Sequence, residues 1–344
     1  MALTQVEISG VSQTGTNNVF AQVGPFKNRI INGDMRIDQR NAGASVTPTA
    51  FTYTLDRWYA DCTVASKFSV QRNAGSVNPP AGFTNYLGVT SLAATTPGAS
   101  DFYTIGQVIE GFNTGDLAFG SASTSTITLS FWVRSSLTGT FGGVLNNSGG
   151  SRAYPFTYSI TSANTWEQKS VIVVGDTSGT WLTNNGAGIE VKFSLGVGST
   201  YAGTAGAWTS SNKFGASGQV NVVGTNGATF YITGVQLEAG SVATPFERRS
   251  YGQELALCER YYQTLYNHSY YYLAGQATIY ANFPHRQKMR ITPTSYALIS
   301  GSAYSNTLTF SPAPQGVDGG ILYIGSSAAG YAGGFGIYAA LAEL

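Results

Sequence analysis

The chain has 344 residues, of which 10% are charged, against ~25% in an average globular protein, and its net charge is +1. This balance gives no electrostatic reason to bind nucleic acid or an anionic membrane surface, and no apolar run approaches the ~18 residues that a transmembrane helix needs. The 43 glycines, 21 tyrosines and 18 phenylalanines favour many short strands joined by turns, in a chain long enough for more than one domain.

Residues 1–26 show little periodicity beyond Val6 and Ile8 and carry one charged side chain, Glu7. We expect an extended N-terminal arm, with a disordered leader as the alternative. The first residues have neither the basic region nor the apolar region of a secretory signal, so none is expected.

Residues 27–245 predict one antiparallel β-sandwich, because stretches of alternating apolar and polar residues recur with turn residues between them. The alternation is clearest in 127–133 and 189–197. Ile31, Met35 and Ile37 share one parity and predict a half-buried strand. Further candidate strands are 86–92, 103–109, 141–145, 154–160 and 166–174.

The closing strand of this sandwich changes parity in its middle. Phe230 and Ile232 share one parity and Val235 and Leu237 share the other, so the alternation slips at Gly234. Glycine suits the backbone of a β-bulge, and we therefore expect a bulged strand with Phe230 and Ile232 facing the core.

Residues 246–266 predict a linker and one short helix that ends near Tyr266. Ser250 and Gln253 form a capping-box pattern at its start. A coiled-coil-like seam at three- and four-residue spacing predicts an oligomer interface formed by Leu255, Cys258, Tyr262 and Leu265. The alternative is that the helix packs back on its own sandwich.

Residues 267–344 predict a small β-rich C-terminal domain with a thin core, which we expect to gain burial from a neighbouring subunit. Its candidate strands begin with Tyr270–Tyr272 and continue with 279–283, 288–291, 296–299, 307–310, 321–324 and 334–341.

Several stretches together resemble a family of tailed-bacteriophage virion proteins, described as tail fibre or carbohydrate-binding-module-like proteins. The strongest is the run from Gly234-Val-Gln-Leu-Glu-Ala-Gly240 through Ala-Thr-Pro-Phe-Glu-Arg-Arg249 to Tyr251–Gln263, and the others are 28–40, 53–59 and 128–136. The resemblance implies a jelly-roll β-sandwich, an arm (1–26) that attaches to other virion proteins, and a distal homotrimerisation domain. It brings no catalytic motif.

Catalysis has little support in the residues. Glycoside hydrolysis needs two opposed carboxylates, and spacing along the chain gives no pair among Asp34, Asp38, Asp56, Asp61, Asp101, Glu110 and Asp116. There is no nucleophile motif, no zinc-binding spacing, and only two histidines. We therefore expect no catalytic residues and no cofactor.

The resemblance also implies a structural Ca²⁺ between the first and last strands of the sandwich, for which Asp34 and Glu238 are the nearest equivalents. Gly234 stands where an acid is often found, which argues against this cation. The two cysteines, Cys62 and Cys258, are expected to be buried free thiols.

Sugar recognition usually uses a flat aromatic side chain flanked by hydrogen-bonding groups. The candidates in polar, glycine-rich surroundings are Trp181, Tyr201, Trp208, Tyr271 and Tyr331, with loop packing or subunit contact as the alternative. Trp58 and Trp132 lie within strands and are expected to be structural.

These observations favour a non-enzymatic virion appendage that contacts host-surface glycans on the exterior of the particle. The alternatives are a depolymerase tailspike and a secreted carbohydrate-binding protein.

Overall fold

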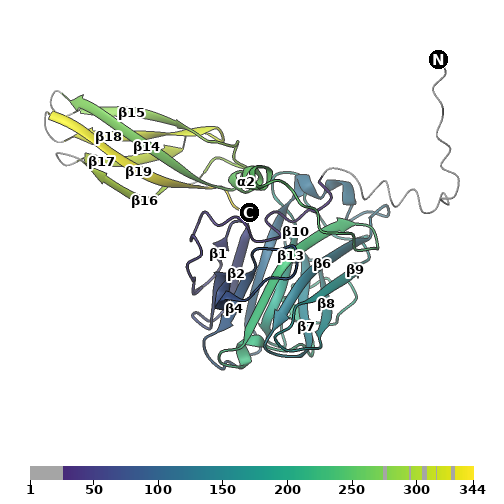
Figure 1. Cartoon of the computed structure of the whole chain (residues 1–344). Helices are drawn as coiled ribbons and strands as arrows, with labels where there is room; N and C mark the ends of the chain where they lie inside the picture. Colours follow the sequence, from purple (N-terminus) through teal and green to yellow (C-terminus); the bar gives the residue numbers. More distant parts are fainter. Residues whose placement is uncertain (1–25, 274–276, 294–295, 304–307, 315, 327–329) are drawn as a thin grey trace, which may run out of the picture.

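The computed structural model describes residues 26–273, 277–293, 296–303, 308–314, 316–326 and 330–344. It is an all-β sandwich of the jelly-roll kind with one short helix and, beyond it, two small sheets (Figure 1). The fold class therefore agrees with the prediction.

Two antiparallel sheets face each other in the sandwich. The six-stranded sheet has the order β1-β2-β5-β10-β7-β8, formed by β1 (Thr52–Leu55), β2 (Trp58–Cys62), β5 (Phe102–Glu110), β10 (Ala187–Val197), β7 (Gly139–Asn147) and β8 (Ala153–Ile160). The five-stranded sheet has the order β3-β4-β13-β6-β9, formed by β3 (Phe68–Arg72), β4 (Leu87–Ser91), β13 (Thr229–Ala239), β6 (Ile127–Ser135) and β9 (Glu167–Val173).

Short elements connect these strands. A small parallel pair joins β11 (Ala202–Gly203) to β12 (Gly215–Ala216), and the single-turn helices are η1 (Ala74–Ser76), η2 (Gly111–Asn113), η3 (Gly115–Leu117) and η4 (Val222–Gly224).

The core lies between the two sheets and is rich in aromatic rings. Phe131 of β6 meets Phe193 of β10 edge-to-face at 5.0 Å and Tyr158 of β8 at 4.9 Å. Trp58 is fully buried, as expected of a structural tryptophan. Such edge-to-face pairs stabilise the fold beyond the area that they bury.

β13 lies at the centre of its sheet and carries the predicted bulge. Its register against β6 shifts between Thr233 and Gln236, and Gly234 has φ +61°, in the left-handed region. Phe230 and Ile232 are fully buried on the core side, and so are Val235 and Leu237 beyond the shift. The bulge prediction is confirmed.

The predicted strand over 31–37 is wrong. Ile31, Met35 and Ile37 are buried as expected, but the segment forms no strand, and Asn32 and Met35 have positive φ. A side chain takes the place of a neighbouring strand here, because the Gln107 amide forms hydrogen bonds with both the N–H and the C=O of Ile31 at 2.8 Å. The alternation of apolar residues therefore indicates burial of a turn-rich segment and not a β-strand.

The helix α2 (Tyr251–Glu259) begins with the predicted capping box of Ser250 and Gln253 but ends seven residues earlier than expected. Tyr262 already pairs with Leu341 in the next sheet, so a strand replaces the last helical turns. Within the described residues, no helix is long and apolar enough to cross a membrane.

The predicted helical seam is therefore corrected. Tyr262 and Leu265 lie in β14 (Tyr262–Leu273), and both are buried together with Cys258 within the single chain. Leu255 packs on a cluster that joins Cys258 and Tyr261 to Ile31 and Ile37. The helix thus packs back on the sandwich, which was the alternative interpretation, and self-association stays a prediction without this seam.

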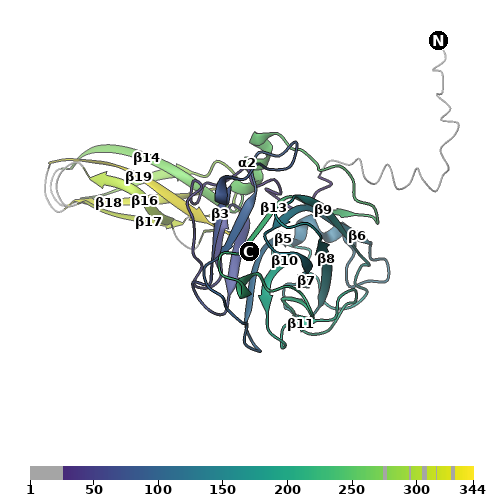
Figure 2. The same ribbon diagram turned by 60° about the horizontal axis from the view of Figure 1, so that its bottom comes forward.

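Beyond α2, two three-stranded antiparallel sheets extend away from the sandwich in both views (Figure 1 and Figure 2). Their orders are β14-β19-β16 and β15-β18-β17, with β15 (Ala277–Pro284), β16 (Tyr296–Ala303), β17 (Leu308–Pro314), β18 (Gly319–Ser326) and β19 (Gly330–Leu341). The strand predicted over 288–291 is not formed. There, Arg290 donates to the carbonyls of Ala342 and Glu343 and holds the C-terminal residues instead.

Buried charges hold the end of the chain against the sandwich. Arg57 is fully buried, donates to the carbonyl of Val108 and forms an ion pair with Glu343. Its guanidinium lies 3.6 Å from the centre of the Tyr261 ring, and Arg40 also pairs with Glu343 at 2.5 Å. Cys62 and Cys258 are both buried free thiols.

Candidate functional site

The outward side chains of the five-stranded sheet include an aromatic row. Along β6, Phe131 and Val133 face the core. Trp132 and Arg134 alternate with them and are half-buried on the opposite face of the sheet. The same residues pair with Thr233 and Tyr231 of β13. Strand alternation thus places an indole and a guanidinium side by side on this face.

At one end of the row, aromatic rings pack against one another beneath Arg134. Its guanidinium lies 5.4 Å from the Tyr231 ring centre, and Tyr231 lies 5.1 Å from Tyr86, which meets Trp166 edge-on at 5.6 Å. The Trp166 indole N–H donates to the carbonyl of Asn78 at 2.8 Å. Burial raises the pKa of Tyr86, so its phenol remains protonated and donates to the carbonyl of Ala74.

At the other end, Phe83 and Phe246 meet edge-to-face at 5.3 Å, with the Arg248 guanidinium 4.7 Å from the Phe83 ring centre. The bulge glycine makes this arrangement possible. A Cβ at Gly234 would lie 2.6 Å from the Phe83 ring and 3.2 Å from the Trp132 ring. Bare backbone at this position therefore lets Phe83 lie close to Trp132.

We call this surface the aromatic strip, formed by Trp166, Arg134, Trp132, Phe83, Phe246 and Arg248 above the buried rings of Tyr86 and Tyr231. Each of the six is half-buried or exposed. Within the described part of the chain, nothing accepts a hydrogen bond from the Trp132 indole N–H. Flat rings beside available donors can hold an amphipathic, ring-shaped ligand through its apolar face and its hydroxyls.

The predicted sugar-binding tryptophans meet each other elsewhere. Trp181 and Trp208 lie 5.4 Å apart, edge-on, and Phe119 and Tyr154 complete their cluster. Their indole N–H groups donate to the protein's own backbone, to Ser178 at 3.1 Å and Val174 at 2.7 Å. This is the loop-packing alternative, although Trp208 is half-exposed.

The remaining predicted aromatics are not part of this cluster. Tyr201 packs against Phe214 at 5.0 Å and Phe102 at 5.6 Å. Tyr271 and Tyr331 lie in β14 and β19, and their side chains are outside the described residues.

From the sequence, we expect a structural role for Trp132, and no residue of the strip is among the candidate ligand contacts. A usable signal existed, since Trp132 has the parity of Ser130 and Arg134 and therefore points away from the core. Phe83 and Phe246 lie outside strands and show no periodicity, so only the folded chain brings them to this face.

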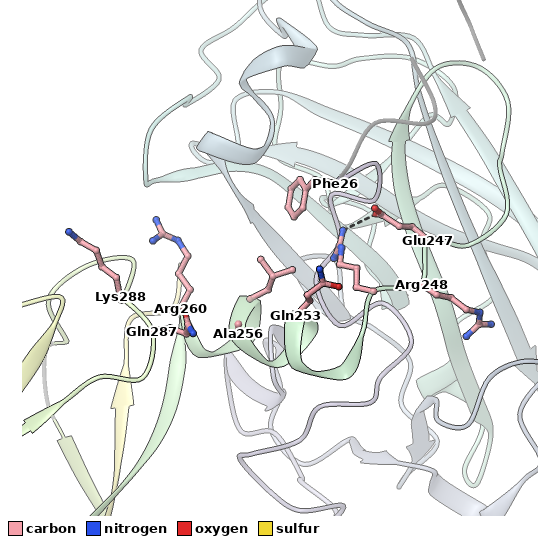
Figure 3. A pocket seen from close by; sticks show the side chains of 10 residues that line it. Phe26, Glu247, Arg248, Gln253, Ala256, Arg260, Gln287 and Lys288 are labelled. Atoms are coloured by element: carbon pink, nitrogen blue, oxygen red, sulfur yellow. Dashed lines mark hydrogen bonds and ion pairs between the residues drawn. The ribbon is translucent and has the colours of Figure 1, made fainter. Parts of the chain in front are cut away.

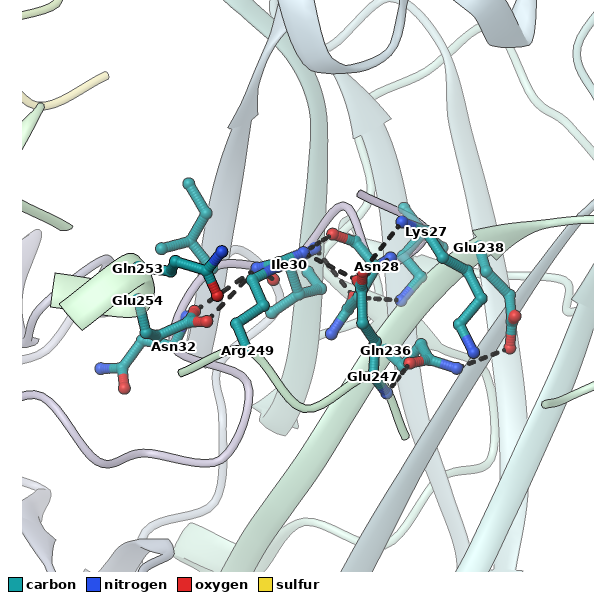
Figure 4. A network of polar contacts seen from close by, with 12 residues as sticks. Lys27, Asn28, Ile30, Asn32, Gln236, Glu238, Glu247, Arg249, Gln253 and Glu254 are labelled. Atoms are coloured by element: carbon teal, nitrogen blue, oxygen red, sulfur yellow. Dashed lines mark hydrogen bonds and ion pairs between the residues drawn. The ribbon is translucent and has the colours of Figure 1, made fainter. Parts of the chain in front are cut away.

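A polar network ties the start of the described chain to β13 and to the segment after it (Figure 4). Asn28 donates to the carbonyl of Val235 and accepts from the N–H of Leu237, both at 3.0 Å. Arg249 lies between Glu247 (3.1 Å) and Glu254 (3.4 Å) and also donates to the carbonyls of Asn28 and Ile30. One arginine thus bridges two carboxylates and donates to two carbonyls at this edge of the sandwich.

Asp34 and Glu238, the predicted metal ligands, have separate partners. Asp34 forms an ion pair with Arg36 at 2.6 Å. Glu238 accepts from Gln236 at 2.8 Å and from the N–H of Thr244 at 2.9 Å. Ca²⁺ takes roughly 6–8 oxygen ligands, and no group of three acidic, histidine or cysteine side chains placed to hold a metal occurs among the described residues. Each of the two carboxylates is thus held by its own protein partners, and a cation between them stays a prediction.

Two of the acids considered for glycoside hydrolysis pair with arginines. Glu110 pairs with Arg260 at 2.5 Å and accepts from the Tyr261 hydroxyl, and Asp116 pairs with Arg29 at 2.6 Å. Glu110 is buried, and the Arg260 guanidinium compensates its charge.

No protein-family model and no curated protein matches the chain. Among solved structures, it is similar to the enzymatically active domain of tailspike protein 4 from bacteriophage CBA120, at 13% identity and a TM-score of 0.32 over 63% of this chain. It spans 22% of the length of that chain.

Two further structures match over their whole length. A putative sugar binding protein from Bacteroides thetaiotaomicron is 12% identical with a TM-score of 0.34, over 62% of this chain and 100% of its own. A family 11 carbohydrate-binding module from a Clostridium thermocellum cellulase is 14% identical with a TM-score of 0.28, over 60% of this chain and 100% of its own. At these identities and TM-scores, the similarities do not indicate a ligand or an activity for this chain.

Proposed function

We propose that the protein is a non-enzymatic glycan-binding protein and that the aromatic strip is its binding surface. The observation that supports this proposal is the position of Trp132, a half-buried indole on an outer sheet face between Arg134 and Phe83. A sugar ring stacks its C–H face on such a ring while guanidinium and indole N–H groups donate to its hydroxyls.

We further propose that this binding serves a bacteriophage particle, as a tail fibre or other appendage that contacts the host surface and is released by lysis. The support is the resemblance of 28–40, 53–59, 128–136 and 234–263 to virion proteins. The arm at 1–26 would then join other virion proteins, and the protein would act as a homotrimer. Light scattering of the intact chain tests the trimer, and a monomer at micromolar concentration contradicts it.

A glycan array carrying bacterial surface polysaccharides tests the binding. We expect selective binding to a small set of glycans, and no binding above background to any of them contradicts the proposal. A reducing-sugar assay on the bound polysaccharides separates the tailspike depolymerase, which releases new ends, from the non-enzymatic protein. Detection of the chain in purified particles separates the virion protein from a secreted carbohydrate-binding protein.

A further inference from the structure

A pocket of about 660 Å³ lies beside α2, between the segments 247–249 and 287–288 (Figure 3). Among the described residues that line it, four are cationic (Arg248, Arg249, Arg260 and Lys288) and one, Glu247, is acidic. Arg249 and Arg260 form ion pairs with acids, so the uncompensated positive charge of the pocket lies on Arg248 and Lys288. Such a concave, cationic site favours an anionic ligand.

Three of these cations, Arg248, Arg260 and Lys288, keep donors available to a ligand, and Arg248 is exposed. The Arg249 donors are already bound by Glu247, Glu254 and backbone carbonyls. Arg260 binds Glu110 through Nε at 2.9 Å and Nη2 at 2.5 Å, which leaves its Nη1 group. Lys288 is exposed, and within the described residues it has no ion-pair partner. Figure 3 shows the Arg260 and Lys288 side chains side by side on one wall.

The other walls suit a ring rather than a bare ion. Phe26 is held above Arg249, with the guanidinium 4.7 Å from its ring centre, and Ala256 and Leu257 of α2 add apolar surface. The amides of Gln253 and Gln287 line the same space. The Gln287 amide can donate to and accept from hydroxyls, and Gln253, whose oxygen accepts from Ser250, adds its N–H donors.

We propose that this pocket binds a carboxylated sugar, with its carboxylate on Lys288 and Arg260 and its ring against Phe26 and Leu257. The ligand class rests on the proposed glycan-binding function, but the site is separate from Trp132. Arg248 lines the pocket and also lies over Phe83 and Phe246, so the aromatic strip ends at the rim of the pocket. A glycan chain on the strip therefore reaches the pocket with an acidic residue.

Calorimetric titration with galacturonic, glucuronic and N-acetylneuraminic acids, and with their methyl esters, tests this assignment. Esterification removes the charge and keeps the ring. We expect one of the acids to bind at least tenfold more tightly than its ester, and Lys288→Glu to abolish this preference. Lys67→Glu makes the same charge change beside β3, away from the pocket, and is expected to have no effect.

Equal affinity for the acids and their esters, no binding of any acid, or equal effects of the two lysine substitutions overturns the proposal. Inorganic phosphate that competes as tightly as the sugar acid also overturns it, because the pocket is then a general anion site. Trp132→Ala keeps the two proposals apart. This variant is expected to lose the glycan chain and still bind the free sugar acid. If it loses the chain but the wild-type protein shows no preference for an acid over its ester, the proposal for the pocket is wrong and the proposal for the aromatic strip stands.

Discussion

Single residues set the response of this protein to pH, and Asp56 is the clearest case. Burial, opposed by Arg40 and by two hydrogen bonds from Gln39, raises the pKa of Asp56 from 3.8 to about 6. The folded protein therefore binds the Asp56 proton more tightly than the unfolded chain does. This contribution to stability is fully present below pH 3.8 and is lost as the pH rises to about 6.

We expect Asp56→Asn to remove this dependence. Since a pKa difference of one unit corresponds to about 1.4 kcal/mol, Asp56→Asn gains up to about 3 kcal/mol relative to the wild type between pH 4 and pH 7. Urea unfolding of both proteins across this range measures the difference, and other titrating groups cancel in it. Parallel stability curves for the two proteins contradict the assignment.

At the scale of elements, the bulge in β13 connects the fold to the aromatic strip. Gly234 has φ +61°, and a side chain there would contact Phe83 and Trp132. Gly234→Val combines backbone strain with overpacking and should lower the free energy of unfolding by about 3 kcal/mol. It should also weaken glycan binding, because both strip rings must move.

Gly218→Val is the matched control for this prediction. Gly218 also has positive φ (+77°), but nothing lies within 4 Å of a Cβ built there. Its substitution isolates the backbone strain and should leave glycan binding intact. Equal losses of stability and binding in the two variants would mean that the bulge does not position the strip.

Sequence pattern predicted most of the sandwich strands, because the face turned to the core requires an apolar residue at every second position of 127–133 and 189–197. It gave no candidate strand for β1, β2 or β3. It failed at 31–37, where distant side chains such as Gln107 satisfy the backbone of an equally alternating segment. It also failed after Glu259, where pairing with β19 takes over from the helical pattern. The parity of Trp132 was visible in the sequence, but its approach to Phe83 depends on the folded loops.

At the scale of the whole molecule, residues far apart in the chain hold the C-terminal end on the sandwich. Glu343 lies between Arg57 and Arg40, and Arg57 is fully buried. Glu343→Gln leaves a buried guanidinium without its counter-charge, which typically costs about 3–5 kcal/mol. We expect a lower Tm and earlier proteolysis near residue 260.

Asp116→Asn provides the comparison, because its ion pair with Arg29 has the carboxylate 59% exposed. Exposed pairs contribute at most about 1 kcal/mol, so this variant should unfold close to the wild type. If Glu343→Gln lowered the stability no more than Asp116→Asn does, the ion pairs of Glu343 would not hold the C-terminal end on the sandwich.

The most direct test of the central claim compares Trp132→Ala with Trp208→Ala in their affinity for a glycan that the wild type binds. Trp132 belongs to the aromatic strip, and Trp208 belongs to the loop cluster with Trp181. We expect Trp132→Ala to weaken binding at least tenfold, or about 1.4 kcal/mol, and Trp208→Ala to leave the affinity within about twofold. The reverse result, with affinity lost in Trp208→Ala and kept in Trp132→Ala, would place the binding site in the loop cluster and contradict the account.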